Sequence, residues 1–509
     1  MSSSSHQAHR PDGSRGRTTR WDEGIPPMLR PLVRAYLLGY VSSVAPRLLT
    51  LLLQHLTRRK LKRQAQEPAT TPAGAQPQKN GEPFLEALQR ILRGGLDWQR
   101  FPTFCAVLVG GSTLLERPFS VVFSQLANNL SEIARRRLSR WCASFTAAWL
   151  SLRLLQSKQT PSFTDTLPSA NGTPPKTIHY AGRTLDLTFF AVTRALDVIG
   201  GELWHRRRLR RRRQVPQNPG WSSLESAVSR LTDPAIFALS SGLIMWTWIY
   251  LPSRLPRAYN KWIGSAAAVD GRLIEALRLC RTGKLRYGLD TGCANLLGSM
   301  CADYGWPEEW GNPAKSVPFP CEMVHMGCGP SCEYHAVSRF ARSFRWAMAT
   351  YLPLSLLLAL GRSSDHRRLP AGLRRALLSA ARSSAFLATF IALFYYGVCL
   401  ARTRVGPSVL GKDAAAREKI DGGYCIACGC LLCGWSILFE HPGRRKDLAL
   451  FVAPRALATL FPRRYALDKQ WRETLVFAAS TALVFTCVRE NRARVRGVFG
   501  SVLGSVLQA

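Results

Sequence analysis

The most restrictive feature of the sequence is a series of apolar stretches that carry no formal charge and approach the length of a membrane-spanning helix. The three longest are Pro234–Ser253, Ser383–Ala401 and Gly422–Phe439. A single span needs roughly 20 apolar residues, so we predict about five to eight spans, some of them tilted, partly buried or re-entrant. Four shorter stretches complete the series: Phe101–Leu115, Trp141–Leu152, Trp346–Gly361 and Thr474–Val488.

The charge balance also points to a membrane. The chain has 69 Lys and Arg against 32 Asp and Glu, a net charge of +37, which requires an anionic neighbour such as nucleic acid or lipid headgroups. Basic segments alternate with the apolar stretches, and Trp246, Trp248 and Tyr250 lie near the end of one stretch, as in an aromatic belt. We therefore expect membrane lipids with anionic headgroups as partners and no nucleic acid. A soluble nucleic-acid-binding protein is the alternative.

Composition predicts how the chain is divided. Met1–Arg20 lacks the apolar core of a signal peptide, Glu67–Pro83 has the composition of a flexible linker, and Gln159–Pro175 is Ser/Thr/Pro-rich and predicts a loop. Leu32–Leu56 is apolar but interrupted by two arginines and a proline, which predicts an interfacial or kinked helix, with a single span as the alternative. The expected segments are a disordered basic tail (1–30), an interfacial helix and flexible linker (31–83), a first helical membrane half (84–203), a basic connector (204–232), a membrane span and amphipathic helix (233–316), a Cys/His-containing loop (317–335), a second helical membrane half (336–490) and a C-terminal tail (491–509).

The basic connector opens with a run of arginines, WHRRRLRRRR. Such a run also occurs in nuclear-localisation and nucleic-acid-binding segments. Its position between apolar stretches favours a juxtamembrane patch, in which each charge gains about 1 kcal/mol at an anionic surface. The predicted membrane-surface residues are Arg206, Arg207, Arg208, Arg210, Arg211, Arg212 and Arg213.

Two short segments, GGSTLLERP and GWSILFEHP, share the pattern G-x-S-x-L-[LF]-E-x-P. Each follows an uncharged run and precedes an arginine-rich one, so an internal duplication is the simplest explanation; chance similarity of two helix ends is the alternative. The small residues allow close helix packing in lipid, each glutamate is expected to pair with an arginine at a helix end, and each proline is expected to end the helix. A carboxylate in a transport path is the alternative role. The residues are Gly110, Ser112, Glu116 and Pro118 in the first copy and Gly434, Ser436, Glu440 and Pro442 in the second.

The segment 317–335 contains the pattern C-x3-H-x2-C-x3-C-x2-H. Thiolates and imidazoles are the ligands of tetrahedral zinc, but the spacing is not that of a standard zinc finger. Loop packing is the preferred interpretation, with a zinc site and a disulfide or oxidation-sensitive loop as alternatives. The zinc candidates are Cys321, His325, Cys328, Cys332 and His335.

A second group of cysteines, Cys425, Cys428, Cys430 and Cys433, lies inside an apolar stretch. An iron–sulfur site is one interpretation. Buried cysteine behaves as a small apolar residue, so we prefer tight helix packing. No Ser/His/Asp, HExxH or Gly-rich dinucleotide pattern appears in a suitable context. We therefore predict no catalytic residue, no cofactor and no enzymatic activity.

Several blocks resemble the transmembrane protein 135 family in its fungal branch. They are VPFPCEMVHMGCGPSCEYHAVSRFARSFRWAMATYLPLSLLLAL from Val317, RSSAFLATFIALFYYGVCLARTRVG from Arg382, and LLCGWSILFEHPGRRKDLALFVAPRAL from Leu431, with a looser block in 85–255. The resemblance implies a multi-pass protein of peroxisomal or mitochondrial membranes, linked to lipid handling and organelle dynamics. It also implies distant similarity to the Tim17-type translocase and peroxisomal membrane protein superfamily. It carries no catalytic residue onto this chain.

The sequence and the resemblance together predict an all-α, multi-pass transmembrane protein with two related helical halves. We expect a non-enzymatic protein of a peroxisomal or mitochondrial membrane that affects lipid handling and organelle dynamics. The alternative is a transporter or protein translocase with a polar path between the two repeats. The two hypotheses differ in whether Glu116 and Glu440 line a water-filled cavity or bind arginines at helix ends.

Overall fold

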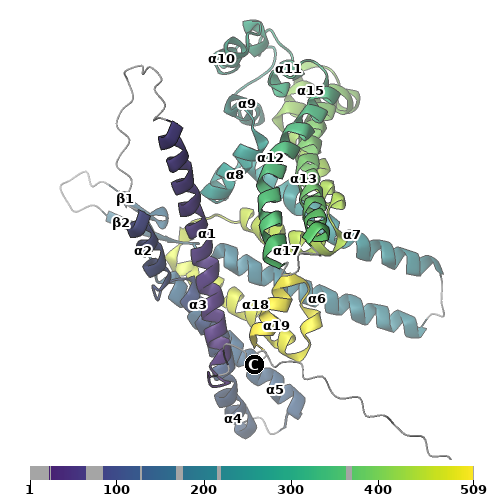
Figure 1. Ribbon diagram of the computed structural model, residues 1–509. Helices are drawn as coiled ribbons and strands as arrows, with labels where there is room; N and C mark the ends of the chain where they lie inside the picture. The colour runs from purple at the N-terminus through teal and green to yellow at the C-terminus, as the bar shows by residue number, and fades with distance from the viewer. Residues whose placement is uncertain are drawn as a thin grey trace, which may run out of the picture. The chain divides into compact units, whose positions relative to one another are not determined.

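The computed structural model describes residues 22, 24–64, 84–126, 129–167, 176–214, 219–362 and 369–507. The protein is 81% helical, so the predicted all-α class is confirmed (Figure 1). The predicted tail Met1–Arg20 and linker Glu67–Pro83 lie outside the described residues. The chain forms two compact units, Met1–Leu155 with Gly504–Ala509 and Gln156–Leu503, each of which is described by itself.

Six helical segments in the described part of the chain are long and apolar enough to cross a membrane. This number falls within the predicted range, and Arg30–Leu52, for which a single span was the alternative, is among them. The apolar stretches Trp141–Leu152 and Pro234–Ser253 are helical but are not among the six. The other five segments are Phe101–Leu126, Cys332–Gly361, Leu369–Leu410, Ala414–Phe439 and Leu467–Glu490.

The first unit is built from helices α1 to α5. Helix α1 passes through Pro46 without a break and packs against α3 so closely that a Cβ on Gly39 would lie 2.9 Å from Cα of Pro102. Helix α3 in turn packs against α5, where a Cβ on Gly111 would lie 3.1 Å from Cβ of Ala147. Small residues therefore set the helix spacing, as is usual in lipid. The bounds are α1 Arg30–Gln64, α2 Phe84–Gly95, α3 Phe101–Leu114, α4 Glu116–Leu126 and α5 Glu132–Gln156.

The second unit contains a small antiparallel sheet, whose first strand lies within Gln159–Pro175, where the sequence predicted a loop. Strand β1 (Thr164–Leu167) pairs with β2 (Lys176–Ala181), with Thr164 opposite His179. Strand β2 also pairs with β3 (Tyr465–Ala466), with Tyr180 opposite Ala466. Threonine and tyrosine favour strands once they have a pairing partner, and β3 comes from a distant part of the sequence. The sheet therefore closes a long-range contact that the local Ser/Thr/Pro content did not indicate.

A bundle of long helices forms the centre of the second unit. Its core contains Ile244, Met245, Trp248 and Ile249 of α7 together with residues of α13, α16 and α17. Helices α13 and α16 cross at glycines: a Cβ on Gly397 would lie 2.8 Å from Cα of Gly429. The helices of the bundle and its surroundings are α6 Leu185–Gln214, α7 Pro219–Tyr250, α13 Leu369–Leu400, α14 Gly406–Leu410, α15 Ala414–Lys419, α16 Cys425–Cys433, α17 Pro442–Thr459, α18 Gln470–Glu490 and α19 Gly497–Leu507.

Helices α12 (Cys332–Arg362) and α13 form a hairpin, and Figure 1 shows short helices gathered where α12 begins and α13 ends. Helices α9, α10 and α11 share a small core of their own, with Ala276, Met300, Cys301 and Met323 completely buried. We call residues 257–331 the cap. Its helices are α8 Arg257–Ala267, α9 Gly271–Arg281, α10 Ala294–Tyr304 and α11 Cys321–His325.

Candidate metal centre

A reversal of the chain after α11 brings the Cys/His-containing loop back onto the start of α12. Met326 follows α11 with φ 51°, and Gly327 and Gly329 both have φ 82°. This left-handed backbone is readily adopted by glycine and costs more for a residue with a side chain. The reversal lets the residues of α11 face the first turn of α12 rather than continue away from it.

Four side chains converge at this point: Cys321 and His325 from α11, Cys332 from the start of α12 and Cys399 from the last turn of α13. Their ligand atoms all lie within 4.8 Å of one another. Sγ of Cys321 lies 3.7 Å from Sγ of Cys399 and 3.9 Å from Sγ of Cys332, and Sγ of Cys399 lies 3.4 Å from Nε2 of His325. We call these four residues the Cys3His group.

The spacing within the Cys3His group is that of ligands around one metal ion. A tetrahedral site with zinc–sulfur bonds of about 2.3 Å and zinc–nitrogen bonds of about 2.0 Å has sulfur–sulfur edges of about 3.8 Å and sulfur–nitrogen edges of about 3.6 Å. The sulfur–sulfur separations of 3.7 and 3.9 Å are too long for a disulfide, whose bond is about 2.05 Å. The group therefore consists of free thiols at metal-ligand separations.

The tautomer of His325 suits a ligand. Its Nδ1 lies 2.7 Å from the carbonyl oxygen of Gly329. A carbonyl oxygen only accepts, so Nδ1 carries the proton and the lone pair of Nε2 points at the thiols. Metal-bound histidines almost always donate their other ring nitrogen in this way, which fixes the orientation of the ring.

The environment also favours the ligand form of a thiol. The hydrogen bond with Cys399 is the main cause that lowers the pKa of Cys321 to about 4, against the opposing effect of burial. Burial disfavours the imidazolium of His325, but hydrogen bonds with Cys321 and Gly329 outweigh it and raise its pKa. The thiolate is the species that binds metals, and Cys321 is poised to supply it.

Buried ionic contacts hold the segment before α11 against the end of α13. Arg402, in the π-helical turn Ala401–Val405, binds Asp421 at 2.6 Å and donates to the carbonyl of Phe319 at 2.9 Å. The side chains of Arg402 and Asp421 are only 3% and 1% exposed, so this pair is positioned by the fold. Arg404 of the same turn pairs with Glu333 of α12. The buried contacts of Arg402 thus hold Phe319 against the end of α13, and the exposed Arg404–Glu333 pair adds a surface contact to α12.

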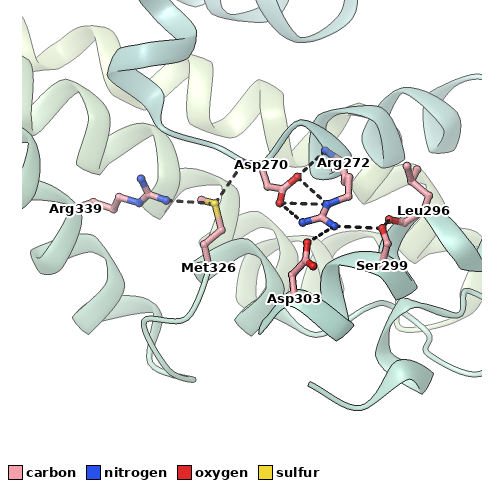
Figure 2. Close-up of polar contacts among 7 residues, drawn as sticks. All are labelled: Asp270, Arg272, Leu296, Ser299, Asp303, Met326 and Arg339. Carbon is pink, nitrogen blue, oxygen red and sulfur yellow. Dashed lines mark hydrogen bonds and ion pairs between the residues drawn. The ribbon is translucent and has the colours of Figure 1, made fainter. Parts of the chain in front are cut away.

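Met326, the residue after His325, links α12 to the start of α9, and Figure 2 shows its contacts with Asp270 and Arg339. Sδ of Met326 accepts from the backbone nitrogen of Asp270 at 3.4 Å and from Arg339 at 3.6 Å. Asp270 caps α9 by accepting from the backbone nitrogen of Arg272. Arg339 of α12 also donates to the carbonyls of Ala267 and Ala268 at the end of α8. Met326 is thus held by the start of α9 on one side and by α12 on the other.

The structure brings together three of the five predicted zinc candidates. Cys328 lies outside the Cys3His group, 2.5 Å from a guanidinium nitrogen of Arg342. His335 is completely buried and stacks on His325 with ring centroids 4.5 Å apart; in the described part of the chain neither of its ring nitrogens has a hydrogen-bond partner. Cys399 was missed, because it stands in the apolar stretch Ser383–Ala401, which the sequence predicted to be a membrane span.

The four cysteines of α16 do not form a metal-binding group among the described residues. Cys425, Cys430 and Cys433 are buried in the core of the second unit, and the thiol of Cys433 donates to the carbonyl of Cys430 at 3.5 Å. Each contributes to packing between α16 and its neighbours. This placement agrees with the packing role preferred for these cysteines.

The two copies of the repeated pattern both lie at helix junctions. In the first unit Glu116 begins α4 and binds Arg140 of α5 at 2.8 Å. In the second unit the buried carboxylate of Glu440 accepts from Ser383 at 3.0 Å and from Arg444 at 3.4 Å. Ser112 donates to the carbonyl of Val109 at 2.8 Å. Both copies thus place the glutamate beside an arginine.

Other residues of the pattern differ from expectation or mark close packing. Pro118 lies in the first turn of α4 and Pro442 opens α17, so each proline begins a helix rather than ending one. Proline is tolerated there because the first turn leaves its nitrogen without a helical partner. A Cβ on Gly434 would lie 2.3 Å from Cα of Ala238, and one on Gly110 would lie 2.7 Å from Leu32. Ser436 is buried, and in the described structure its hydroxyl has no partner.

The predicted basic connector is helical in the described residues. Its arginines continue α6 to Gln214, and α7 begins at Pro219. Arg206 pairs with Glu202 at 2.9 Å, and Glu225 of α7 binds Arg208 at 3.8 Å and Arg211 at 3.5 Å. The exposed fractions of the Arg206, Arg208 and Arg211 side chains are 65%, 51% and 37%. Part of the positive charge of the α6 arginines is thus offset by glutamates of α6 and α7. The side chains of Arg212 and Arg213 lie outside the described ones.

The Cys3His group is the strongest indication of a functional site in the described chain. Four side chains from three helices place their metal-binding atoms within 4.8 Å of one another. The resemblance noted for the blocks after Val317 and Arg382 has no independent support. No family model matches the chain, and neither a curated protein nor a solved structure matches it.

Proposed function

We propose that the chain is a non-enzymatic integral protein of a peroxisomal or mitochondrial membrane that affects lipid handling and organelle shape. The observation that carries the membrane part is the outward apolar face of α12. The apolar window within Cys332–Gly361 has a mean hydropathy of 1.3 and only 6% of it is buried. Leu354, Leu357, Leu358 and Leu360 are 51–66% exposed. A continuous aliphatic face of this kind needs lipid or another helix.

The sequence resemblance supports the lipid-handling role, and the environment of the two glutamates bears on the transporter alternative. In a transport path each carboxylate would face water or substrate. Glu116 instead binds Arg140, and Glu440 binds Ser383 and Arg444. These contacts favour a structural role over the transporter alternative, because a carboxylate at a helix end is stabilised by a neighbouring arginine.

Two measurements test the proposal in order. Alkaline carbonate extraction should leave the full chain in the membrane pellet, and release into the supernatant would remove the membrane assignment. A tagged chain should then coincide with a peroxisomal or mitochondrial marker, and deletion of the gene should change organelle number, shape or lipid content during growth on fatty acids. Unchanged organelles and lipids on both fatty acids and glucose would contradict the organelle role while leaving membrane insertion intact.

A further inference from the structure

We propose that Cys321, His325, Cys332 and Cys399 bind one zinc ion, which ties the cap to the open end of the α12–α13 hairpin. The inference rests on the geometry of the Cys3His group and is independent of the organelle in which the protein acts. It is argued from the identity of the ligands, their closure around one point and the elements that they join.

The donor set selects the metal class. Three thiolates and one imidazole are soft to intermediate ligands that suit zinc, whereas magnesium and calcium require oxygen ligands. The separations of 3.7, 3.9 and 3.4 Å match a tetrahedron, which is the geometry of structural zinc sites. The proton on Nδ1 of His325, held by Gly329, leaves Nε2 free to bind.

The site is closed, which assigns it a structural role. All four positions of a tetrahedron are filled by protein, whereas catalytic zinc sites keep one position for water or substrate. His325 and Cys399 are completely buried, and Cys321 and Cys332 are partly buried. Binding of Zn²⁺ displaces to solvent the protons that the thiols still carry, with no change of oxidation state.

The ligands come from elements that the fold must hold together. Cys321 and His325 belong to α11, whose Met323 is buried in the core of the cap. Cys332 is the first residue of α12, and Cys399 is the penultimate residue of α13. One ion at this point links the two ends of the hairpin to each other and to the cap, replacing a set of separate weak contacts with coordinate bonds.

The first test is metal analysis of the full chain, purified in detergent from cells supplied with zinc. We expect about one zinc per chain by mass spectrometry of the digested sample, as for a single structural site. Cys321→Ser and Cys399→Ser should each lower the zinc content by about tenfold or more, since removal of a ligand costs at least as much as removal of a supporting contact. The matched control is Cys328→Ser, from the same loop but bound to Arg342, which should keep its zinc.

The second test begins with the wild-type chain, so its first result does not depend on the folding of a variant. Cobalt(II) loaded into the wild-type chain should give the intense visible bands of a tetrahedral site and a thiolate charge-transfer band. Cys399→His, which restores a fourth ligand, should retain cobalt with a weaker charge-transfer band. Zinc far below one per chain in the wild-type protein, iron or copper in its place, octahedral cobalt bands, or equal zinc loss in Cys328→Ser would each overturn the proposal.

Discussion

Sγ of Cys399 lies 3.4 Å from Nε2 of His325, although the two residues are 74 positions apart in the sequence. Helix α13 returns the chain to the point from which α12 departs, so this contact exists only when the hairpin has formed. The same return places Arg404 beside Glu333. Residues that are far apart in the sequence thus meet at the open end of the α12–α13 hairpin.

Glu440→Gln should be tolerated, because the carbonyl oxygen of glutamine can still accept from Arg444 while its amide nitrogen can donate to the hydroxyl of Ser383. Glu440→Ala removes the buried acceptor of the Ser383 hydroxyl and of the backbone nitrogen of His441, and should lower the free energy of unfolding by about 1–3 kcal/mol. Thermal unfolding in detergent measures the difference between the variants. Glu116→Gln, beside Arg140, is the equivalent change in the first unit. Loss of function in both glutamine variants, with normal folding and sorting, would favour the transport alternative instead.

Neutralising the arginines of the α6 run should reduce the amount of anionic lipid that copurifies with the chain. Each fully solvated charge contributes about 1 kcal/mol at an anionic surface. Arg206, Arg208 and Arg211 should contribute less, because Glu202 and Glu225 offset their charge. Glu202→Gln with Glu225→Gln is the control of opposite sign and should increase lipid retention. The same lipid content in both variants would argue against a membrane-surface role.

Gly434→Ala should destabilise the second unit by about 1–3 kcal/mol, the usual cost of overpacking. The added methyl group would meet the backbone of Ala238 at 2.3 Å, a position that cannot yield as a flexible side chain does. Gly200→Ala is the matched control: it is helical, and nothing lies within 4 Å of the added carbon. This control should be neutral or should stabilise α6 by up to about 1 kcal/mol. Melting temperatures in detergent should therefore move in different directions, and equal shifts would contradict the packing described.

Asp270→Asn should lower the stability of residues 257–331 at neutral pH and should make that stability less sensitive to acid. The hydrogen bond from Arg272 is the main cause that holds the pKa of Asp270 below its usual value, so the carboxylate stabilises the fold above about pH 3.9, the ordinary value for Asp. This stabilisation is lost as the pH falls through the lowered pKa. Asparagine keeps the helix cap but not the charge, and the expected cost is about 1 kcal/mol. Hydrogen exchange in α9, corrected for its intrinsic pH dependence, should show the wild type losing protection on acidification and the variant changing little.

The helical class and most spans follow from the sequence because apolar stretches of this length have few alternatives in a basic chain. Local composition was a weaker guide where a contact depends on a distant segment. The sheet is one example, since β2 acquires its partner β3 from Tyr465–Ala466. The arginine run is another example. It continues α6 as a helix, and two of its arginines form ion pairs with Glu225 of the neighbouring helix α7.

The metal candidates show the same limit at the scale of side chains. The spacing of Cys328 and His335 is as suitable as that of Cys321 and Cys332. In the folded chain, however, Cys328 lies against Arg342, and the buried His335 stacks on His325 without joining the Cys3His group. Cys399 sits in an uncharged helix, where a cysteine usually packs as a small apolar residue. Only the return of α13 to α11 reveals it as a fourth ligand. The only sequence clue was its position at the end of an apolar stretch, close to the arginines that follow.

The order in which the four residues of the Cys3His group are synthesised has a consequence for biogenesis. Cys321, His325 and Cys332 leave the ribosome within one short segment, whereas Cys399 emerges only after the whole of α12 and nearly all of α13. A nascent chain that stops between them carries an open coordination sphere with three donors. The fourth donor therefore joins the other three only when α13 packs antiparallel to α12. A complete set of four ligands requires that both helices have been placed in this arrangement.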